Sequence, residues 1–248
     1  MARRSSSFVR HPTNPDATIW RFIDLPKFLD FLYTGSLYFS RLDRLGDPYE
    51  GLPSKEQFDS LRKDPSIEWM ARVIHDSNHY NTFVNSWHLS EHEPAAMWKL
   101  YAGVDAGVAI CSTYARLRRS VQSSAHGVQV SLIHYGDPPS SNVVMWEYAL
   151  WKRKSFEHEH EVRAIIPPTG FSLGSKTNAA GEHRPDVSRQ ARVGIHVPVD
   201  MNQLVTAILL SPTTPHWVLD AIASVTRKFR LKMRIRQSDL YTLDYDES

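Results

Sequence analysis

The chain has 248 residues, of which 42% are hydrophobic and 23% charged, as in ordinary soluble globular proteins. Its formal net charge of +2 is too small to indicate nucleic-acid binding by itself. No apolar run approaches the roughly 18 residues of a membrane-spanning helix, so we expect no membrane partner. The single cysteine, Cys111, permits no internal disulfide, which favours a cytoplasmic protein.

Residues 1–16 are polar and contain two prolines, so we expect a flexible N-terminal arm. The chain then opens with a strand, a helix and a second strand. Residues 18–23 are rich in β-branched and aromatic side chains, Asp24 can cap a helix that Gly35 ends, and residues 36–40 are again strand-like. No repeat or hinge-like linker follows, which predicts one α+β domain over residues 17–248.

The rest of the chain alternates between segments with helical spacing of apolar residues and segments with the apolar alternation or β-rich composition of strands. In order, it predicts helices at 54–64 and 66–78, a strand at 81–90, a helix at 95–101, a strand at 108–111, a helix at 114–121, a strand at 128–135, a helix at 143–154, a strand at 159–166, a long exposed loop at 168–191, strands at 192–199 and 204–210, a helix at 215–229 and a strand at 231–236.

A cluster of ionisable residues leads into the apolar strand at 159–166. If that whole segment is extended, Glu159, Glu161 and Arg163 share one face, with their two carboxylates about 7 Å apart. His158 and His160 would lie on the other face. Such a group is equally consistent with a functional site and with a solvated strand end that holds a local ion pair.

Several short motifs in this order resemble the bacterial family known as domain of unknown function 2971. They are Tyr38-Phe-Ser40, Gly46-Asp-Pro-Tyr-Glu50, Ser90, Met97-Trp-Lys-Leu-Tyr101, Gly107, Lys154 and Glu159-x-Glu161-x-Arg163. The resemblance spans roughly residues 18–240. The chain departs from the family pattern at Gly46, where asparagine is usual, and at Phe156, where tryptophan is frequent. The family name implies no activity.

The order of the strands also resembles ADP-ribosyltransferases of the Arg–Ser–Glu type. That resemblance implies a split mixed β-sheet with flanking helices that clamps NAD in its cleft. Carried over, Arg21 matches the arginine, Ser86 or Ser90 the serine, and Glu161 the catalytic glutamate, with Glu159 as its companion. The other expected NAD-binding residues are Trp98, Tyr101, Asp47, Glu50 and Arg163.

The chemistry gives each of these residue types a task. Breaking the nicotinamide–ribose bond develops positive charge on the ribose, which a carboxylate such as Glu161 stabilises. Glu159 can act as a base toward an acceptor, and Arg21 can bind a phosphate through its fork of donors. Tyr101 or Trp98 can stack on the nicotinamide, although such aromatic residues more often belong to a core.

Two alternatives remain. Four histidines could hold a zinc ion in a hydrolase: His88, His92, His158 and His160. A binding module without catalysis could use the basic segment 116–119 and the residues Lys232, Arg234 and Arg236 to contact nucleic acid. The leading hypothesis is an enzyme that moves ADP-ribose from NAD to a nucleic acid or protein, as a toxin or phage-defence effector. The sequence does not indicate its oligomeric state.

Overall fold

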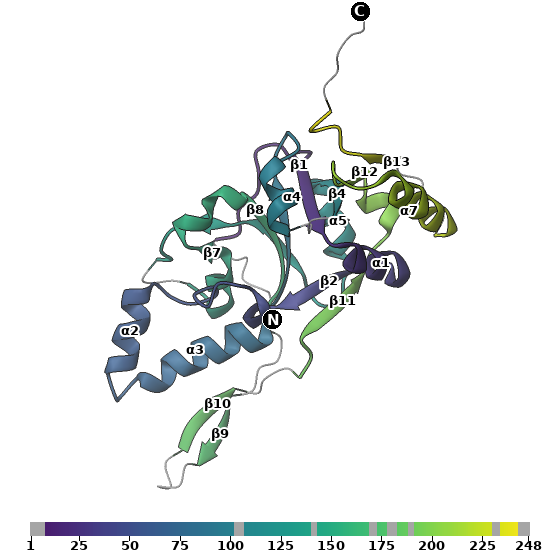
Figure 1. Ribbon diagram of the computed structural model, residues 1–248. Helices are drawn as coiled ribbons and strands as arrows, with labels where there is room; N and C mark the ends of the chain where they lie inside the picture. Colours follow the sequence, from purple (N-terminus) through teal and green to yellow (C-terminus); the bar gives the residue numbers. More distant parts are fainter. Residues whose placement is uncertain are drawn as a thin grey trace, which may run out of the picture. The chain divides into compact units, whose positions relative to one another are not determined.

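A computed structural model describes residues 8–101, 107–139, 143–168, 173–177, 183–187, 191–229 and 234–242. These residues form a mixed β-sheet with flanking helices (Figure 1). The chain divides into two compact units. Three strands start in one unit and end in the other: β2 (Ser36–Arg41), β3 (Phe83–Leu89) and β11 (Gly194–Pro198).

The first unit comprises residues 1–11, 38–86 and 124–195. Its helical elements are η1 (Leu42–Arg44), α2 (Lys55–Lys63), α3 (Glu68–Asn81), η2 (Met145–Leu150) and η3 (Lys154–Glu159). Its further strands are β5 (Gln129–Leu132), β6 (His134–Tyr135), β7 (Trp151–Lys152), β8 (Glu161–Ile166), β9 (Leu173–Thr177) and β10 (His183–Val187).

The sheet of the first unit is built around β8, which pairs with both β3 and β5. All six residues of β8 are buried, as expected for a strand with neighbours on both edges and cover on both faces. One face packs on a core of Leu42, Val84, Ala149, Leu150, Trp151 and Ile165. Residues 1–7 of the expected arm lie outside the described residues, and Phe8 packs against Trp151.

The second unit comprises residues 12–37, 87–123 and 196–248. Its strands are β1 (Thr18–Ile23), β4 (Val108–Thr113), β12 (Ala207–Leu210) and β13 (Arg234–Gln237). Its helices are α1 (Leu25–Thr34), α4 (Ala95–Tyr101), α5 (Tyr114–Gln122), α6 (Met201–Leu204) and α7 (His216–Lys228). Strand β1 pairs antiparallel with β3 and β4, β4 pairs antiparallel with β12, and β13 joins β12 in parallel.

The opening strand–helix–strand prediction is confirmed. The Asp24 side chain accepts a hydrogen bond from the Lys27 N–H at 2.9 Å, which caps α1. Gly35 ends the helix with φ of 59°, a left-handed conformation that glycine adopts without strain. Both signals act within a few residues, so the sequence alone reveals them.

The predicted helix at 143–154 is wrong. The chain instead makes the 3₁₀ helix η2, the short strand β7 and the 3₁₀ helix η3. Strand β7 pairs in parallel with β6, placing Trp151 opposite His134, and the two rings stack with their centroids 4.6 Å apart. This pairing with a distant segment, together with burial of Trp151, replaces the helix that local aromatic periodicity predicted.

Two further predictions need correction. The strand predicted at 159–166 starts at Glu161, because Glu159 ends η3 and His160 is left-handed, with φ of 39°. The loop predicted at 168–191 contains an antiparallel pair of strands, β9 and β10. Backbone hydrogen bonds hold such a pair without an apolar side-chain pattern, so composition did not reveal it. Within the described residues, no helix has the length and apolar character needed to cross a membrane.

Candidate functional site

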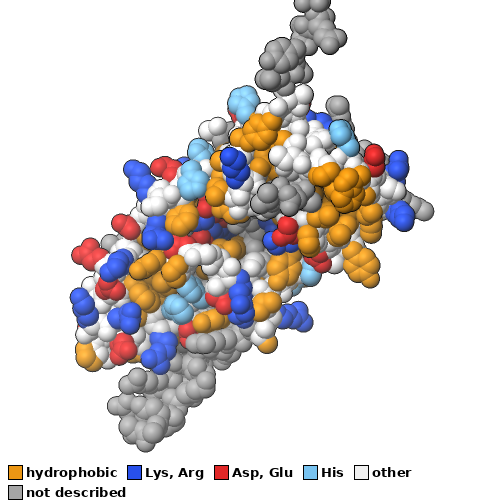
Figure 2. Space-filling model, in the orientation of Figure 1, with side chains coloured by type: hydrophobic (Ala, Val, Ile, Leu, Met, Phe, Trp, Pro, Cys, Tyr) orange, Lys and Arg blue, Asp and Glu red, His pale blue; other side chains and the backbone are white. Residues whose placement is uncertain are grey.

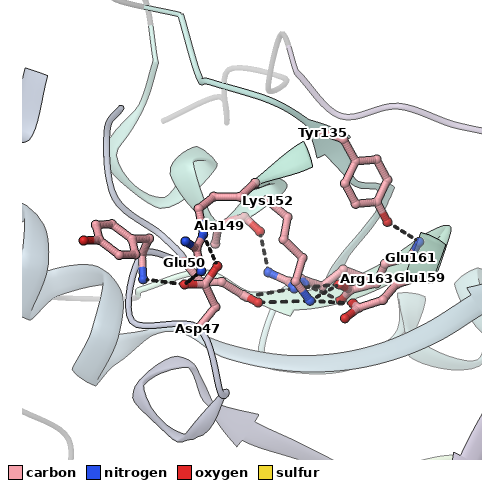
Figure 3. A network of polar contacts seen from close by, with 10 residues as sticks. Asp47, Glu50, Tyr135, Ala149, Lys152, Glu159, Glu161 and Arg163 are labelled. Atoms are coloured by element: carbon pink, nitrogen blue, oxygen red, sulfur yellow. Dashed lines mark hydrogen bonds and ion pairs between the residues drawn. The ribbon is translucent and has the colours of Figure 1, made fainter. Parts of the chain in front are cut away.

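Five ionisable side chains of the first unit form a buried charge network (Figure 3). Its members are Glu50, Lys152, Glu159, Glu161 and Arg163. Their exposed side-chain fractions are only 2%, 8%, 11%, 4% and 0%, respectively. Three carboxylates against two cations leave one net negative charge within the network. A charged cluster this enclosed is costly to bury unless its members neutralise one another.

Arg163 is the centre of the network. Its guanidinium forks onto Glu161, with Nε 2.6 Å from Oε1 and Nη2 2.8 Å from Oε2. Residues two apart on β8 share a face, so the strand itself aligns these two side chains. Nη2 also lies 2.9 Å from a Glu50 carboxylate oxygen, and Nη1 donates to the Ala149 carbonyl at 3.0 Å. Burial lowers the pKa of Arg163, but Glu161 and Glu50 outweigh that effect and raise it overall.

Lys152 links the three carboxylates. Its Nζ lies 3.1 Å from Glu50, 2.5 Å from Glu159 and 3.4 Å from Glu161. Figure 3 shows Lys152 and Arg163 reaching between Glu50 and the two glutamates near β8. Burial lowers the pKa of Lys152, but Glu161 and Glu50 raise it above its ordinary value overall. The side chain is therefore a fixed ammonium ion rather than a free amine nucleophile.

The Glu161 carboxylate stays ionised although it is buried. Burial raises its pKa, but Arg163 and Lys152, with hydrogen bonds from Arg163 and Ser86, bring it well below its usual range. The Glu161 backbone N–H donates to the Tyr135 phenol oxygen at 2.7 Å. Burial raises the pKa of Tyr135 to about 12, so the phenol stays neutral at physiological pH.

The sequence predicted that Glu159 lies near Glu161, but for the wrong structural reason. Strand alternation would have aligned it with Glu161, but the left-handed His160 separates the two residues. Glu159 reaches the network through Lys152 instead. His158 and His160 do not share a strand face, because both precede β8. Among the described residues there is no group of three or more histidine, cysteine or acidic side chains that could hold a metal ion.

The structure distinguishes between the two candidate serines. Ser86 hydrogen-bonds to Glu161 from the adjacent strand β3. Ser90 belongs to the second unit, where its hydroxyl donates to the His92 carbonyl at 2.7 Å. Of the expected binding residues, Asp47 and Glu50 also belong to the first unit, and the Glu50 N–H donates to the Asp47 carbonyl at 3.2 Å.

Arg21, Trp98 and Tyr101 belong to the second unit. Trp98 is 4% exposed and packs edge-to-face on Phe22 in the core, and its indole N–H donates to Glu93 at 2.8 Å. Because neighbouring residues of β1 point to opposite faces, Arg21 lies on the face opposite Phe22 and Trp98. Of the two aromatic residues proposed to stack on the nicotinamide beside Arg21, Tyr101 or Trp98, Trp98 is therefore the one that lies on the other face of β1.

The remaining predicted residues of this unit have different environments. Burial lowers the pKa of Arg21 to about 10, and the side chain is only partly exposed. Tyr101, at 47% exposed, is the more accessible of the two aromatic residues proposed for stacking. It lies at the C-terminal end of α4 and is absent from the core cluster that holds Trp98.

The basic residues proposed for nucleic acid are partly engaged within the chain. Arg116 donates to the Gln203 carbonyl at 2.6 Å, and Arg236 pairs with Asp239 at 3.3 Å. Lys232 lies outside the described residues. On the face shown in Figure 2, lysine and arginine side chains are interspersed with acidic ones rather than gathered into one basic surface.

Sequence reasoning missed Lys152, Tyr135 and Arg153. Arg153 pairs with Asp47 in a fork, with Nε 3.0 Å from Oδ2 and Nη2 2.9 Å from Oδ1. Lys152 and Arg153 fell in the helix wrongly predicted at 143–154, and Tyr135 ended a predicted strand. Their basic and phenolic groups beside the acidic segment were visible in the sequence, but their convergence depends on pairing between β6 and β7.

No family model matches the sequence, and neither a curated protein nor a solved structure matches the chain. The site must therefore be interpreted from its own geometry and chemistry.

Proposed function

We propose that the first unit carries the active site of a cytoplasmic enzyme that transfers ADP-ribose from NAD to a macromolecular acceptor, either a nucleic acid or a protein. The observation that carries this proposal is the Ser86–Glu161 hydrogen bond, in which a serine on one strand meets an ionised glutamate on its neighbour. In the Arg–Ser–Glu plan Ser86 would be the serine and Glu161 the glutamate, so their contact supports the resemblance at the two positions closest to the chemistry.

In this proposal Glu161 supplies fixed negative charge. The bond between the nicotinamide nitrogen and the ribose carbon breaks, and its electron pair leaves with the nicotinamide. Positive charge develops on the ribose, where a carboxylate already held by Arg163 and Ser86 needs no reorganisation to stabilise it. Each of the three guanidinium nitrogens of Arg163 contacts Glu161, Glu50 or Ala149, so in this proposal Arg163 positions Glu161 rather than binding phosphate.

Glu159 is the proposed base. An acceptor nucleophile forms a bond to the ribose carbon and gives its proton to this carboxylate. Glu159 is 11% exposed, against 4% for Glu161, so it is the more accessible of the two. It also lies at the end of η3 rather than inside the buried strand β8. A toxin or phage-defence effector is the biological setting we propose.

The test has two readouts. Purified protein is incubated with NAD to measure nicotinamide release, and with labelled NAD and cell extract to measure transfer to an acceptor. We expect Glu161→Gln to lower either activity by about 100-fold or more, as for removal of one preorganised charge-stabilising group. Glu159→Gln should reduce transfer more than nicotinamide release, because water can replace the acceptor without the same base.

The matched control is Glu157→Gln, which removes an exposed carboxylate from the same 3₁₀ helix. This control should leave nicotinamide release and transfer within about twofold of the wild-type values, since no described contact joins Glu157 to the network. Thermal melting and circular dichroism establish that each variant is folded. Nicotinamide release and transfer that are unchanged in folded Glu161→Gln would refute the proposal, as would wild-type protein that neither cleaves NAD nor labels any acceptor.

A further inference from the structure

A solvent-exposed arginine, Arg153, directly follows Lys152 of the buried network in the chain. Arg153 is 52% exposed although its fork onto the buried Asp47 fixes its guanidinium. Its Cζ lies 4.9 Å from the centre of the Tyr49 ring and 5.4 Å from that of Phe156. We call Asp47, Tyr49, Arg153 and Phe156 the arginine platform. Nε and Nη2 are used by Asp47, while no described residue accepts a hydrogen bond from Nη1.

Another arginine of the first unit, Arg41, also pairs with an aspartate and an aromatic ring, but it is buried. Arg41 forks onto Asp43 at 2.6 and 3.0 Å, and its Cζ lies 5.3 Å from the centre of the Tyr80 ring. There the arginine side chain is only 10% exposed, and its Nη1 donates to the Arg192 carbonyl at 3.4 Å. That arginine is structural. Arg153 has partners of the same kinds, an aspartate and aromatic rings, but it stays half exposed. Its Nη1 group donates to no described residue.

The platform adjoins the network through Phe156. The Lys152 ammonium lies 4.8 Å from the centre of the Phe156 ring, which also contacts Arg153. Lys152 and Arg153 are consecutive residues, and only Lys152 enters the network. A molecule bound at the platform would therefore lie near Phe156, the ring that Lys152 of the network also contacts.

We propose that the arginine platform binds a nucleoside diphosphate, with Arg153 donating to a phosphate oxygen and the planar base stacking on the exposed guanidinium and the Tyr49 ring. Arginine offers both functions, because its planar ion forks onto phosphates and stacks on flat rings. Tyr49 is 43% exposed, so its ring is accessible. The inference rests on the proposed function, since it assigns the diphosphate of NAD to Arg153 rather than to Arg21.

Binding is measured by calorimetry with ADP, which lacks the nicotinamide bond and so separates binding from catalysis. Inorganic pyrophosphate and adenosine are the two partial ligands. Arg153→Gln is the main variant, because an amide can still donate one hydrogen bond to Asp47. Tyr49→Leu removes the flat ring. Arg44→Gln is the matched control, since Arg44 is a 57%-exposed arginine of the same unit that lies outside the platform.

We expect ADP to bind more tightly than pyrophosphate and adenosine. Arg153→Gln should weaken ADP at least about tenfold, the loss expected for one charge-assisted hydrogen bond, and Tyr49→Leu several-fold. Arg44→Gln should change affinity less than about twofold. Binding of ADP that is unaffected by folded Arg153→Gln would overturn the inference while leaving the proposed activity standing. Pyrophosphate binding as tight as ADP, or no ADP binding at millimolar concentration, would also overturn it.

Discussion

Arg163 offers the sharpest test of how the buried network is held. Replacing it with methionine preserves a long, unbranched side chain but removes the only fully buried cation of the network. Glu161 then loses the two hydrogen bonds that Arg163 donates to it, whereas Glu50 retains its contact with Lys152 at 3.1 Å. The network changes from three carboxylates and two cations to three carboxylates and one cation. Leaving a buried charge uncompensated in this way costs about 3–5 kcal/mol of unfolding free energy.

The cost should depend on pH. In the wild type the pKa of Glu161 is depressed, so its stabilising contribution is present at neutral pH and is lost only as pH falls through that low value. Without Arg163 the burial effect dominates and the folded-state pKa of Glu161 rises. The variant then takes up a proton on Glu161 at mildly acidic pH, which removes the uncompensated charge. The difference in stability between wild type and variant should therefore be smaller at pH 5 than at pH 7.5.

Urea unfolding followed by tryptophan fluorescence measures this difference at both pH values. The control Arg44→Met removes an exposed arginine whose Nε lies 3.7 Å from Asp43, and it should change stability by less than about 0.5 kcal/mol. The double variant Arg163→Met/Glu161→Met restores the net charge of the network and should recover most of the lost stability. A loss below about 1 kcal/mol in Arg163→Met at pH 7.5, or an equal loss at both pH values, would refute this reasoning.

Three other predictions concern single positions. Tyr135→Phe should cost about 1–3 kcal/mol in thermal unfolding, because the Glu161 N–H loses its acceptor; a melting temperature equal to wild type would contradict this. Gly51→Ala should destabilise by more than about 1 kcal/mol in urea, since φ is 76° and the added Cβ would lie 2.5 Å from Leu42; an unchanged midpoint would show that the site adapts. Burial raises the pKa of Cys111 to about 12, so at pH 8 a disulfide reagent should modify it only after unfolding, and rapid modification of native protein would refute its burial.

The sequence predicted those parts of the fold that depend on neighbouring residues. Asp24 and Gly35 delimit α1, and Thr113 caps α5 by accepting from the Arg116 N–H. Alternation along β1 places Trp20 and Phe22 on the face opposite Arg21, but the sequence could not show which face α4 would cover. That choice depends on packing between segments about 75 positions apart in the chain, and it separates Trp98 from Arg21.

The candidate site was predicted in part, for the same reason. Glu161 and Arg163 could be paired from strand alternation, because they are two residues apart. Glu50 was expected at the site only through the resemblance, and in the structure it contacts both cations of the network. Lys152 could not be placed, since its position depends on β7 pairing with β6. The site is assembled from separate segments, and strand alternation could predict only the local pair of Glu161 and Arg163.

Burying this network of charges carries a large desolvation cost. Replacing a buried ion pair by apolar residues of similar size is often neutral or stabilising, so the charges themselves are weak evidence of a structural role. The first unit already has an apolar core in which Val84 and Ile165 pack together. With three carboxylates and two cations, the five residues of the network carry one net negative charge. The proposed transfer of ADP-ribose requires an ionised, preorganised carboxylate such as Glu161 to stabilise positive charge on the ribose. Under that proposal, the double variant at Arg163 and Glu161 should recover stability but should not cleave NAD.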